Sequence, residues 1–234
     1  MRLALLGYGA MGKLVEKLAT SAGDEIGLTL SSRDKSLDAR QLAASLSGHD
    51  VAIDFSVSSA VLRNIEACAR ANVPLVEGTT GWQDREAEAR RLIEDHKGAL
   101  VYGANFSIGV NVFYRIVSQA ARLMAGLDQY QAFMEEAHHS RKRDAPSGTA
   151  LKLKDLMSEY IRTEIPITSV RAGHIPGTHR VGFDSPADQI MLTHMARSRE
   201  GFAGGALVAA RWILARKGVY EFSEVLTEVM RAEG

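Results

Sequence analysis

The sequence predicts an α/β protein built on a doubly wound parallel sheet, followed by a part of α+β character. Three observations carry this prediction. Short apolar runs alternate with helix-like segments as far as Asn105, and a glycine-rich turn joins the first such run to the first helix. After Asn105 the helix-like segments become separated by strands that alternate or pair antiparallel. The chain therefore divides into two structurally different parts.

The elements of the first part follow one another in a regular order. Strands are predicted at 3–6, 25–30, 51–55, 74–77 and 99–102, and helices at 13–22, 60–71 and 85–96. Several of the strands are short and apolar without a polar alternation, which is typical of parallel strands that helices cover on both faces.

The second part mixes helices with strands of a different kind. Helices are predicted at 112–124 and 150–162, and strands at 130–136, 170–172, 178–183 and 189–196. A last long helix at 202–215 and a short terminal one complete the chain.

Composition excludes several classes of protein. The 28 basic and 28 acidic residues give a net charge of zero, so no overall field attracts nucleic acid or an anionic membrane. The apolar run at 3–6 is too short for a signal peptide or a membrane span. The single cysteine, Cys68, allows no disulfide within the chain. We expect a cytoplasmic protein.

A glycine-rich motif follows the first predicted strand and opens the first helix: Gly7, Tyr8, Gly9, Ala10, Met11 and Gly12. In this context Gly7 allows a tight turn, Gly9 lets the backbone approach a pyrophosphate, and Gly12 lets helix and strand pack closely. The N-terminus of the helix then offers free N–H groups to phosphates. The motif predicts a Rossmann-like fold that binds a dinucleotide.

The end of the second strand bears on which dinucleotide is used. A carboxylate that binds the ribose 2′-hydroxyl is expected there, but the chain has Ser31 and Ser32 followed by Arg33. A hydroxyl and a guanidinium suit a 2′-phosphate, which favours NADPH. Asp34 lies one residue after the expected position of this carboxylate and could still bind the ribose of NADH, so use of NADH also remains open.

Two further loops leave the carboxyl ends of predicted strands, where ligands bind in this fold. They carry the candidate cofactor residues Gly78, Thr79 and Thr80, and Gly103, Ala104, Asn105 and Phe106. Threonine and asparagine side chains there can form hydrogen bonds with a nicotinamide carboxamide or a ribose.

The most informative segment spans 135–150 and reads EEAHHSRKRDAPSGTA. Ser147, Gly148 and Thr149 precede a helix and present hydroxyl and backbone N–H groups to an anion. His138 and Lys142 add proton-transfer capacity and positive charge. The segment predicts a pocket for a small carboxylate substrate that accepts a proton.

This segment resembles the signature of the 4-hydroxy-tetrahydrodipicolinate reductase family, formerly called dihydrodipicolinate reductases. Nearly the whole chain shares the resemblance, because further motifs occur in the family's order: Gly7 to Gly12, Asp54-Phe55-Ser56, Gly78-Thr79-Thr80-Gly81, Ala104-Asn105-Phe106-Ser107 with Gly109-Val110-Asn111, and Arg171-Ala172-Gly173. The chain departs from the family at Ser31 and Ser32, where many members have an acidic residue, and in being somewhat short.

The resemblance implies roles for particular residues. His138 would be a proton donor or acceptor and Lys142 the proton donor, while His139, Ser147, Gly148 and Thr149 would bind the substrate carboxylates. The substrate would be (2S,4S)-4-hydroxy-2,3,4,5-tetrahydrodipicolinate, a cyclic dicarboxylate of lysine biosynthesis by the diaminopimelate route. NADPH or NADH would reduce it to 2,3,4,5-tetrahydrodipicolinate, with loss of water.

The resemblance also implies the domain organisation. A Rossmann domain would comprise 1–106 and 208–234. An α+β domain for substrate binding and oligomerisation, inserted at 107–207, would assemble the chain into a homotetramer.

Three alternatives remain beside this reading. Zinc is disfavoured because adjacent histidines on a strand point to opposite faces, and no Cys or HExxH pattern joins His138 and His139 to the later histidines. Another NAD(P)-dependent dehydrogenase of a small carboxylate is an alternative, but a semialdehyde dehydrogenase of the acyl-enzyme type is disfavoured because Cys68 lies within a helix-like segment. A non-catalytic NAD(P)-binding sensor would keep the glycine motif but would not need the pairing of His138 and Lys142 with Ser147 to Thr149.

Overall fold

The computed structural model describes residues 1–31 and 37–232, which fall into two compact units. The first unit comprises Met1–Ile108 and Glu200–Gly234, and the second comprises Gly109–Arg199. Helix α7 (Glu200–Ile213) lies wholly in the first unit, because its apolar residues from Ala203 onward pack into that unit's core. The sequence analysis instead assigned 107–207 to the inserted domain.

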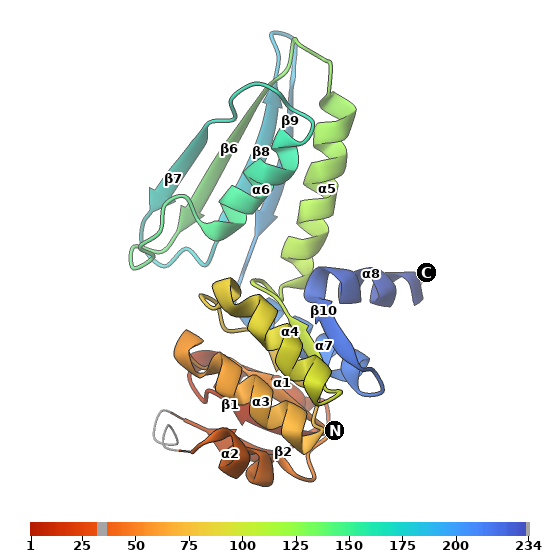
Figure 1. The fold of residues 1–234 in the computed structure, drawn as a ribbon. Helices are drawn as coiled ribbons and strands as arrows, with labels where there is room; N and C mark the ends of the chain where they lie inside the picture. The colour runs from red at the N-terminus through yellow and green to blue at the C-terminus, as the bar shows by residue number, and fades with distance from the viewer. Residues whose placement is uncertain (32–36, 233–234) are drawn as a thin grey trace. The chain divides into compact units, whose positions relative to one another are not determined.

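The first unit alternates strands and helices along most of its length (Figure 1). Its elements are β1 (Arg2–Leu6), α1 (Ala10–Ser21), β2 (Glu25–Leu30), α2 (Ala39–Leu46), β3 (Val51–Asp54), α3 (Val61–Ala71), β4 (Leu75–Glu77), α4 (Glu86–Asp95), β5 (Ala99–Tyr102), α7, β10 (Gly218–Glu221) and α8 (Phe222–Ala232), with 3-10 turns at Ser58–Ala60 and Gln83–Arg85.

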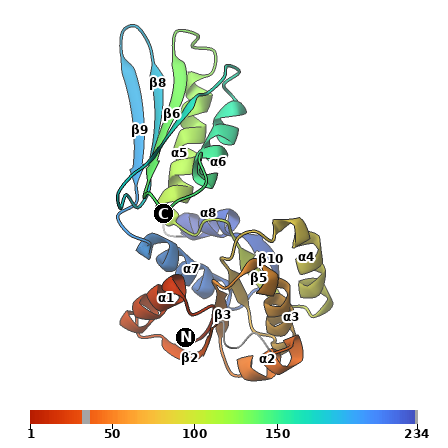
Figure 2. The same ribbon diagram turned by 90° about the vertical axis from the view of Figure 1, so that its left-hand side faces the viewer.

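The six strands of the first unit form one parallel sheet in the order β10-β5-β4-β3-β1-β2. Helices α1, α7 and α8 pack on one face of this sheet and α2, α3 and α4 on the other (Figure 2). The predicted doubly wound parallel sheet is confirmed. The chain reverses its winding direction between β1 and β3, so the loops that follow these two strands meet at the position where such folds bind ligands.

The second unit is a four-stranded sheet with two helices. Its elements are α5 (Ile108–Met124), β6 (Gln131–His138), α6 (Gly148–Ser158), β7 (Ile167–Arg171), β8 (Thr178–Asp184) and β9 (Gln189–Met195). The strand order is β7-β6-β8-β9; β6, β8 and β9 pair antiparallel, whereas β7 runs parallel to β6. Helices α5 and α6 pack on one face of the sheet (Figure 2).

Two elements of the first unit were missed by the sequence analysis. Helix α2 is short, and it begins with a capping box in which Asp38 and Gln41 bind each other's backbone N–H groups. Strand β10 is a four-residue edge strand that is only partly buried, so it lacks the apolar run that marks an inner strand.

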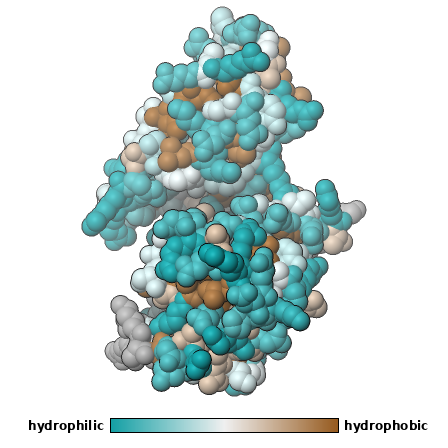
Figure 3. Space-filling model, viewed as in Figure 1, coloured by the Kyte–Doolittle hydropathy of each residue, from teal (hydrophilic) through white to brown (hydrophobic). Residues whose placement is uncertain are grey.

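The outer face of α4 carries charged side chains such as Glu88, Arg91 and Glu94, and this part of the surface is largely hydrophilic in Figure 3. Among the residues that the structure describes, no helix has both the length and the apolar character that crossing a bilayer would require.

Candidate functional site

The turn after β1 has the geometry that its glycines dictate. Gly7 has a φ of +91°, and a Cβ atom there would lie 2.5 Å from the carbonyl carbon of Phe55. A Cβ atom on Gly12 would lie 2.4 Å from the Gly7 carbonyl oxygen, so both positions require glycine for close packing.

The start of α1 leaves room for a ligand. A Cβ atom on Gly9 would have no heavy atom within 4 Å among the described residues, so space is open at this point. Gly9 is the N-cap of α1 without a side-chain cap, and no acidic residue occupies the first turn. A phosphate group fits such a helix start, where N–H groups point outward.

The loop after β4 is held by its own strand and by a tryptophan. The backbone N–H of Thr79 donates to Oε1 of Glu77 at 2.7 Å, and the indole N–H of Trp82 donates to the Thr79 carbonyl at 2.8 Å. A Cβ atom on Gly78 would lie 2.2 Å from the Phe55 ring. The loop is therefore packed against the segment that follows β3.

The loop after β5 is anchored by Phe106. The Phe106 ring is 1% exposed and packs on Phe222 at a centroid distance of 4.6 Å, so it belongs to the core of the first unit. The main chain of Phe106 is thus the part that remains for the expected cofactor contact. The Asn105 side chain accepts a hydrogen bond from the Ser107 N–H at 2.9 Å.

Ser32 and Arg33, the candidate 2′-phosphate residues, lie outside the residues that the structure describes.

In the second unit, a buried ionic network lies at the end of β6. Nδ1 of His138 lies 2.6 Å from Oε2 of Glu136, and Oε1 of Glu136 lies 2.6 Å from the Arg171 guanidinium. The His138–Glu136 contact is close, although the ring N–H is not well aligned with the oxygen. Glu136 is 2% and His138 8% exposed, so both are shielded from solvent.

The network continues to the start of α6 through a second histidine. Strand pairing sets His179 directly opposite Glu136, and the rings of His138 and His179 meet edge to face at 5.1 Å. Nε2 of His179 lies 3.1 Å from the hydroxyl oxygen of Ser147, which also accepts the N–H of Ala150 at 3.2 Å. The Ser147 hydroxyl therefore caps α6, and Ser147 as a whole is only 2% exposed.

Burial governs the charges of this network. Burial is the largest effect on His138 and lowers its pKa, although the Glu136 carboxylate opposes the shift. Burial, followed by the neighbouring His138, lowers the pKa of His179 to about 4. Burial raises the pKa of Glu136, but hydrogen bonds from Arg171 and neighbouring hydroxyls more than offset it, so the net shift is downward. Near neutral pH the network holds two neutral histidines, an ionised Glu136 and the Arg171 cation.

Lys142 and the first residues of α6 follow the end of β6 closely in sequence. The Lys142 ammonium pairs with the Asp144 carboxylate at 2.8 Å, and this bond lowers the pKa of Asp144. A Cβ atom on Gly148 would meet open space. His139 is half-buried directly after β6.

Glu136, His138 and His179 could together offer ligands to a metal ion, because their potential ligand atoms all lie within 4.8 Å of one another. Both oxygens of Glu136 already face partners, one of them the Arg171 cation. A second cation beside this guanidinium would be repelled, so the charges favour the ionic network over a metal site.

Three members of the network were given no catalytic or binding role by the sequence analysis: Glu136, Arg171 and His179. Glu136 precedes His138 by two residues on one strand, and this spacing places both on the same face. This spacing could have identified Glu136 as a partner of His138 from the sequence. His179 and Arg171 reach the network only through the register of β6 with β8 and β7.

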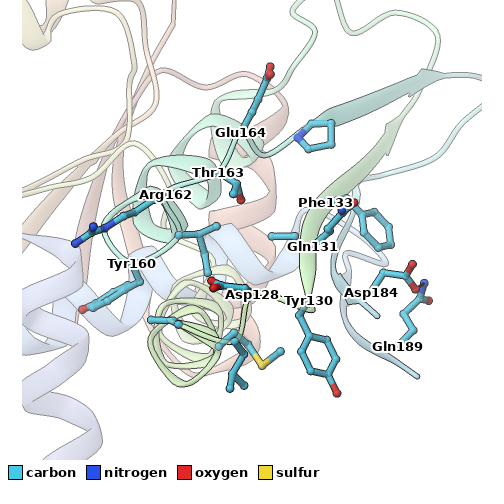
Figure 4. A pocket seen from close by; sticks show the side chains of 17 residues that line it. Asp128, Tyr130, Gln131, Phe133, Tyr160, Arg162, Thr163, Glu164, Asp184 and Gln189 are labelled. Atoms are coloured by element: carbon cyan, nitrogen blue, oxygen red, sulfur yellow. Dashed lines mark hydrogen bonds between the residues drawn. The ribbon is translucent and has the colours of Figure 1, made fainter. Parts of the chain in front are cut away.

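A cavity of about 1140 Å³ lies at another place in the second unit. Figure 4 shows Gln131 and Phe133 from the beginning of β6 along its wall, together with Tyr130, which precedes the strand, and with Tyr160 and Asp184. His138 is at the other end of the same strand, so this cavity is separate from the network.

Family models match both parts of the chain. The model described as "Dihydrodipicolinate reductase, N-terminus" matches residues 1–106, and the model described as "Dihydrodipicolinate reductase, C-terminus" matches residues 109–226.

Individual relatives agree with these models. A 4-hydroxy-tetrahydrodipicolinate reductase of Christiangramia forsetii is 39% identical, with 99% of this chain and 100% of the relative aligned. One of Archaeoglobus fulgidus is 35% identical, with 97% and 100% aligned. The solved structure of a Paenisporosarcina dihydrodipicolinate reductase with bound dipicolinate is similar in fold, with a TM-score of 0.77 at 23% identity, covering 94% of this chain and 97% of that one.

Proposed function

The chain belongs to the 4-hydroxy-tetrahydrodipicolinate reductase family, and from this premise we infer that it reduces (2S,4S)-4-hydroxy-2,3,4,5-tetrahydrodipicolinate with NADPH or NADH. The products are 2,3,4,5-tetrahydrodipicolinate and water, and the reaction belongs to lysine biosynthesis by the diaminopimelate route. The observation that carries the inference is the buried network around His138 beside Lys142 and the start of α6.

The first unit supplies the proposed cofactor site. Support comes from the close-packed turn at Gly7, the open space at Gly9 and the uncapped start of α1, which together suit a dinucleotide pyrophosphate. The remaining proposed contacts are Tyr8, Ala10, Met11, Gly12, Ser32, Arg33, Gly78, Thr79, Thr80, Gly103, Ala104, Asn105 and Phe106. A bound reduced nicotinamide supplies the hydride for the substrate ring.

The second unit supplies the proposed substrate site. Free N–H groups in the first turn of α6, at Gly148 and Thr149, suit one carboxylate, and His139 suits a carboxylate as a further donor. The Ser147 hydroxyl is occupied by Ala150 and His179, so Ser147 contributes by holding the start of α6.

Lys142 is the proposed proton donor. A lysine side chain carries a proton near neutral pH, and its ammonium both stabilises negative charge on the substrate ring and supplies the proton. His138 is mainly neutral there because burial lowers its pKa. With Nδ1 directed to Glu136, its Nε2 atom is left to accept or relay a proton.

We also propose that the enzyme is a cytoplasmic homotetramer. The face of the second unit's sheet that α5 and α6 leave uncovered presents Val170, Met191 and Met195, which are 46%, 40% and 61% exposed. On the same face Arg180 and Glu135 form an ion pair at 3.4 Å. A partly apolar sheet face with balanced charge suits self-association of identical chains.

Steady-state kinetics on freshly prepared substrate test the proposed function. The wild-type protein should oxidise NADPH or NADH only when the cyclic substrate is present. Lys142→Ala should lower kcat by about 10²–10⁴-fold, the usual contribution of a positioned acid. Lys152→Ala, which removes an exposed lysine of α6, is the matched control and should retain wild-type kcat. Wild-type kcat in Lys142→Ala would refute the assignment.

A further inference from the structure

Two carboxyl groups inside the first unit have no part in the proposed chemistry. Asp54 ends β3 and Glu77 ends β4, and the two are register partners in the parallel sheet. Both are 0% exposed on the face of the sheet that α3 covers. Two buried carboxylates in adjacent positions repel one another strongly, so the pair requires a compensating arrangement.

Hydrogen bonds account for three of the four carboxyl oxygens. Asp54 accepts the Ser56 N–H through Oδ1 at 2.7 Å and the side-chain amide of Asn64 through Oδ2 at 2.6 Å. Oε1 of Glu77 accepts the Thr79 N–H at 2.7 Å. Among the described residues no N–H or hydroxyl group donates to Oε2 of Glu77, although this atom is buried.

The unpartnered oxygen points to a proton held between the two acids. The parallel register sets the two carboxyl side chains next to each other on one buried face, and two adjacent carboxyl groups can form a hydrogen bond only through a proton that one of them carries. Burial raises the pKa of both groups, and the Asp54 charge raises that of Glu77 further. Of the two acids, Glu77 is the better candidate to carry the proton, because its pKa is raised further and its Oε2 has no other hydrogen-bond partner among the described residues.

The groups around the pair agree with this assignment. From α3, the Arg63 guanidinium donates to the Asn64 carbonyl oxygen at 2.9 Å and so polarises the amide that binds Asp54. The Cys68 thiol, also on α3, is neutral because burial raises its pKa. From β5, Tyr102 is the register partner of Glu77, and its hydroxyl bonds to Glu86 and Arg90 of α4.

Each acid accepts a hydrogen bond from the backbone N–H of the residue two positions later, Ser56 for Asp54 and Thr79 for Glu77. Both of these residues lie in loops that border the proposed cofactor site. The loops after β1, β3 and β4 are in close contact. A Cβ atom on Gly7, after β1, would lie 2.6 Å from Cα of Ser56, after β3. A Cβ atom on Gly78, after β4, would lie 2.2 Å from the Phe55 ring, also after β3. A displacement of Ser56 or Thr79 therefore displaces the turn at Gly7 as well.

We propose that Asp54 and Glu77 share one proton and act as positioning residues for these three loops, so that NAD(P)H affinity depends on that proton. The proposal rests on the cofactor site proposed above. When the proton is lost at alkaline pH, two adjacent buried charges repel and push the loops apart.

Glu77→Gln is the informative variant, because its amide keeps both contacts. The amide oxygen accepts the Thr79 N–H and the amide nitrogen donates to Asp54, which reproduces the protonated state permanently. Fluorescence titration with NADPH and with NADH should give a wild-type Kd that rises on going from neutral to alkaline pH. Glu77→Gln should match the wild type near neutral pH and then stay flat.

Two further variants separate positioning from general damage. Glu77→Leu leaves the Thr79 N–H without its acceptor, and we expect Kd to rise roughly tenfold, the size of one unsatisfied buried hydrogen bond. Its kcat at saturating cofactor should remain near the wild-type value. Cys68→Ala removes the other buried acid of the cluster and should keep the wild-type pH profile of Kd.

An infrared difference spectrum gives a readout that needs no cofactor. Wild type minus Glu77→Gln, near neutral pH, should show the carbonyl band of a protonated carboxyl group, and its absence would refute the shared proton. If the wild type reduces the substrate but both Glu77 variants bind NAD(P)H like the wild type at every pH, the positioning role is wrong and the proposed function stands. A wild-type protein that binds neither cofactor would overturn the proposed function and the positioning role together.

Discussion

At the scale of single residues, burial decides which groups of the proposed substrate site carry charge. His138 and His179 stay neutral where free histidines begin to titrate, because desolvation outweighs the attraction of the Glu136 carboxylate. Lys142 lies nearer to solvent, paired with Asp144. Lys142 is therefore the proposed source of positive charge and of the proton, and His138 is suited to a neutral role.

His179 makes the stability of the second unit depend on pH. Its folded pKa is about 4, against roughly 6.5 in an unfolded chain. As the pH falls from about 6.5 to about 4, the unfolded chain takes up a proton that the folded one does not. The free energy of unfolding should then fall by up to about 3 kcal/mol.

Denaturant unfolding at a series of pH values checks this prediction. His179→Gln should flatten the acid-side decline. His174→Gln, which removes an exposed histidine of the same unit, should leave the decline as in the wild type. An identical decline in the wild type and His179→Gln would show that another group is responsible.

Arg33 bears on cofactor choice. If its guanidinium meets a 2′-phosphate, Arg33→Ala should raise the Michaelis constant for NADPH about tenfold, the size of one charge-assisted hydrogen bond, and leave that for NADH nearly unchanged. Arg40→Ala, an exposed arginine of α2, is the control. Equal effects of Arg33→Ala on the two cofactors would contradict the proposed role.

At the scale of elements, the start of α6 is expected to join stability to the proposed substrate binding. Ser147 caps the helix whose first N–H groups are proposed to hold a carboxylate, and it also binds His179. The cap is therefore expected to influence both the folding of the second unit and the orientation of its anion site.

Two N-cap variants separate these effects. Ser147→Ala and Asp38→Ala should each lower the free energy of unfolding by about 0.5–2 kcal/mol, since each removes an N-cap side chain. Only Ser147→Ala should also raise the Michaelis constant for the dicarboxylate substrate, because α2 is remote in sequence from the proposed substrate residues. Thermal unfolding and steady-state kinetics measure the two quantities. A similar rise in Asp38→Ala would show that the effect comes from stability alone.

At the scale of the whole molecule, the uncovered sheet face of the second unit predicts assembly. Sedimentation should show four chains for the wild type. The double variant Val170→Lys, Met191→Lys places two charges on this face and should shift the protein to smaller species.

The control for assembly is Leu214→Lys, which adds a charge at an apolar position of the first unit that is 42% exposed. It should sediment like the wild type. An unchanged mass for the double variant would exclude this sheet face as the interface.

Local patterns in the sequence predicted the features that depend on neighbours along the chain. The glycine spacing at Gly7 to Gly12, the apolar runs of the parallel strands and the Ser147 cap before α6 are all local patterns. These patterns were enough to predict the α/β sheet, the α+β part and the family. Turns, caps and the periods of strands and helices are properties of a few consecutive residues.

Which distant residues meet follows instead from the three-dimensional fold. Strand register places His179 beside Glu136 and sets Asp54 against Glu77, and the parallel pairing of β7 brings Arg171 to the same network. No local pattern encodes these pairings, because register follows from how whole faces of strands are buried. Burial in turn sets the pKa of each carboxyl group and histidine that meets there, so the protonation states of both sites are consequences of the fold.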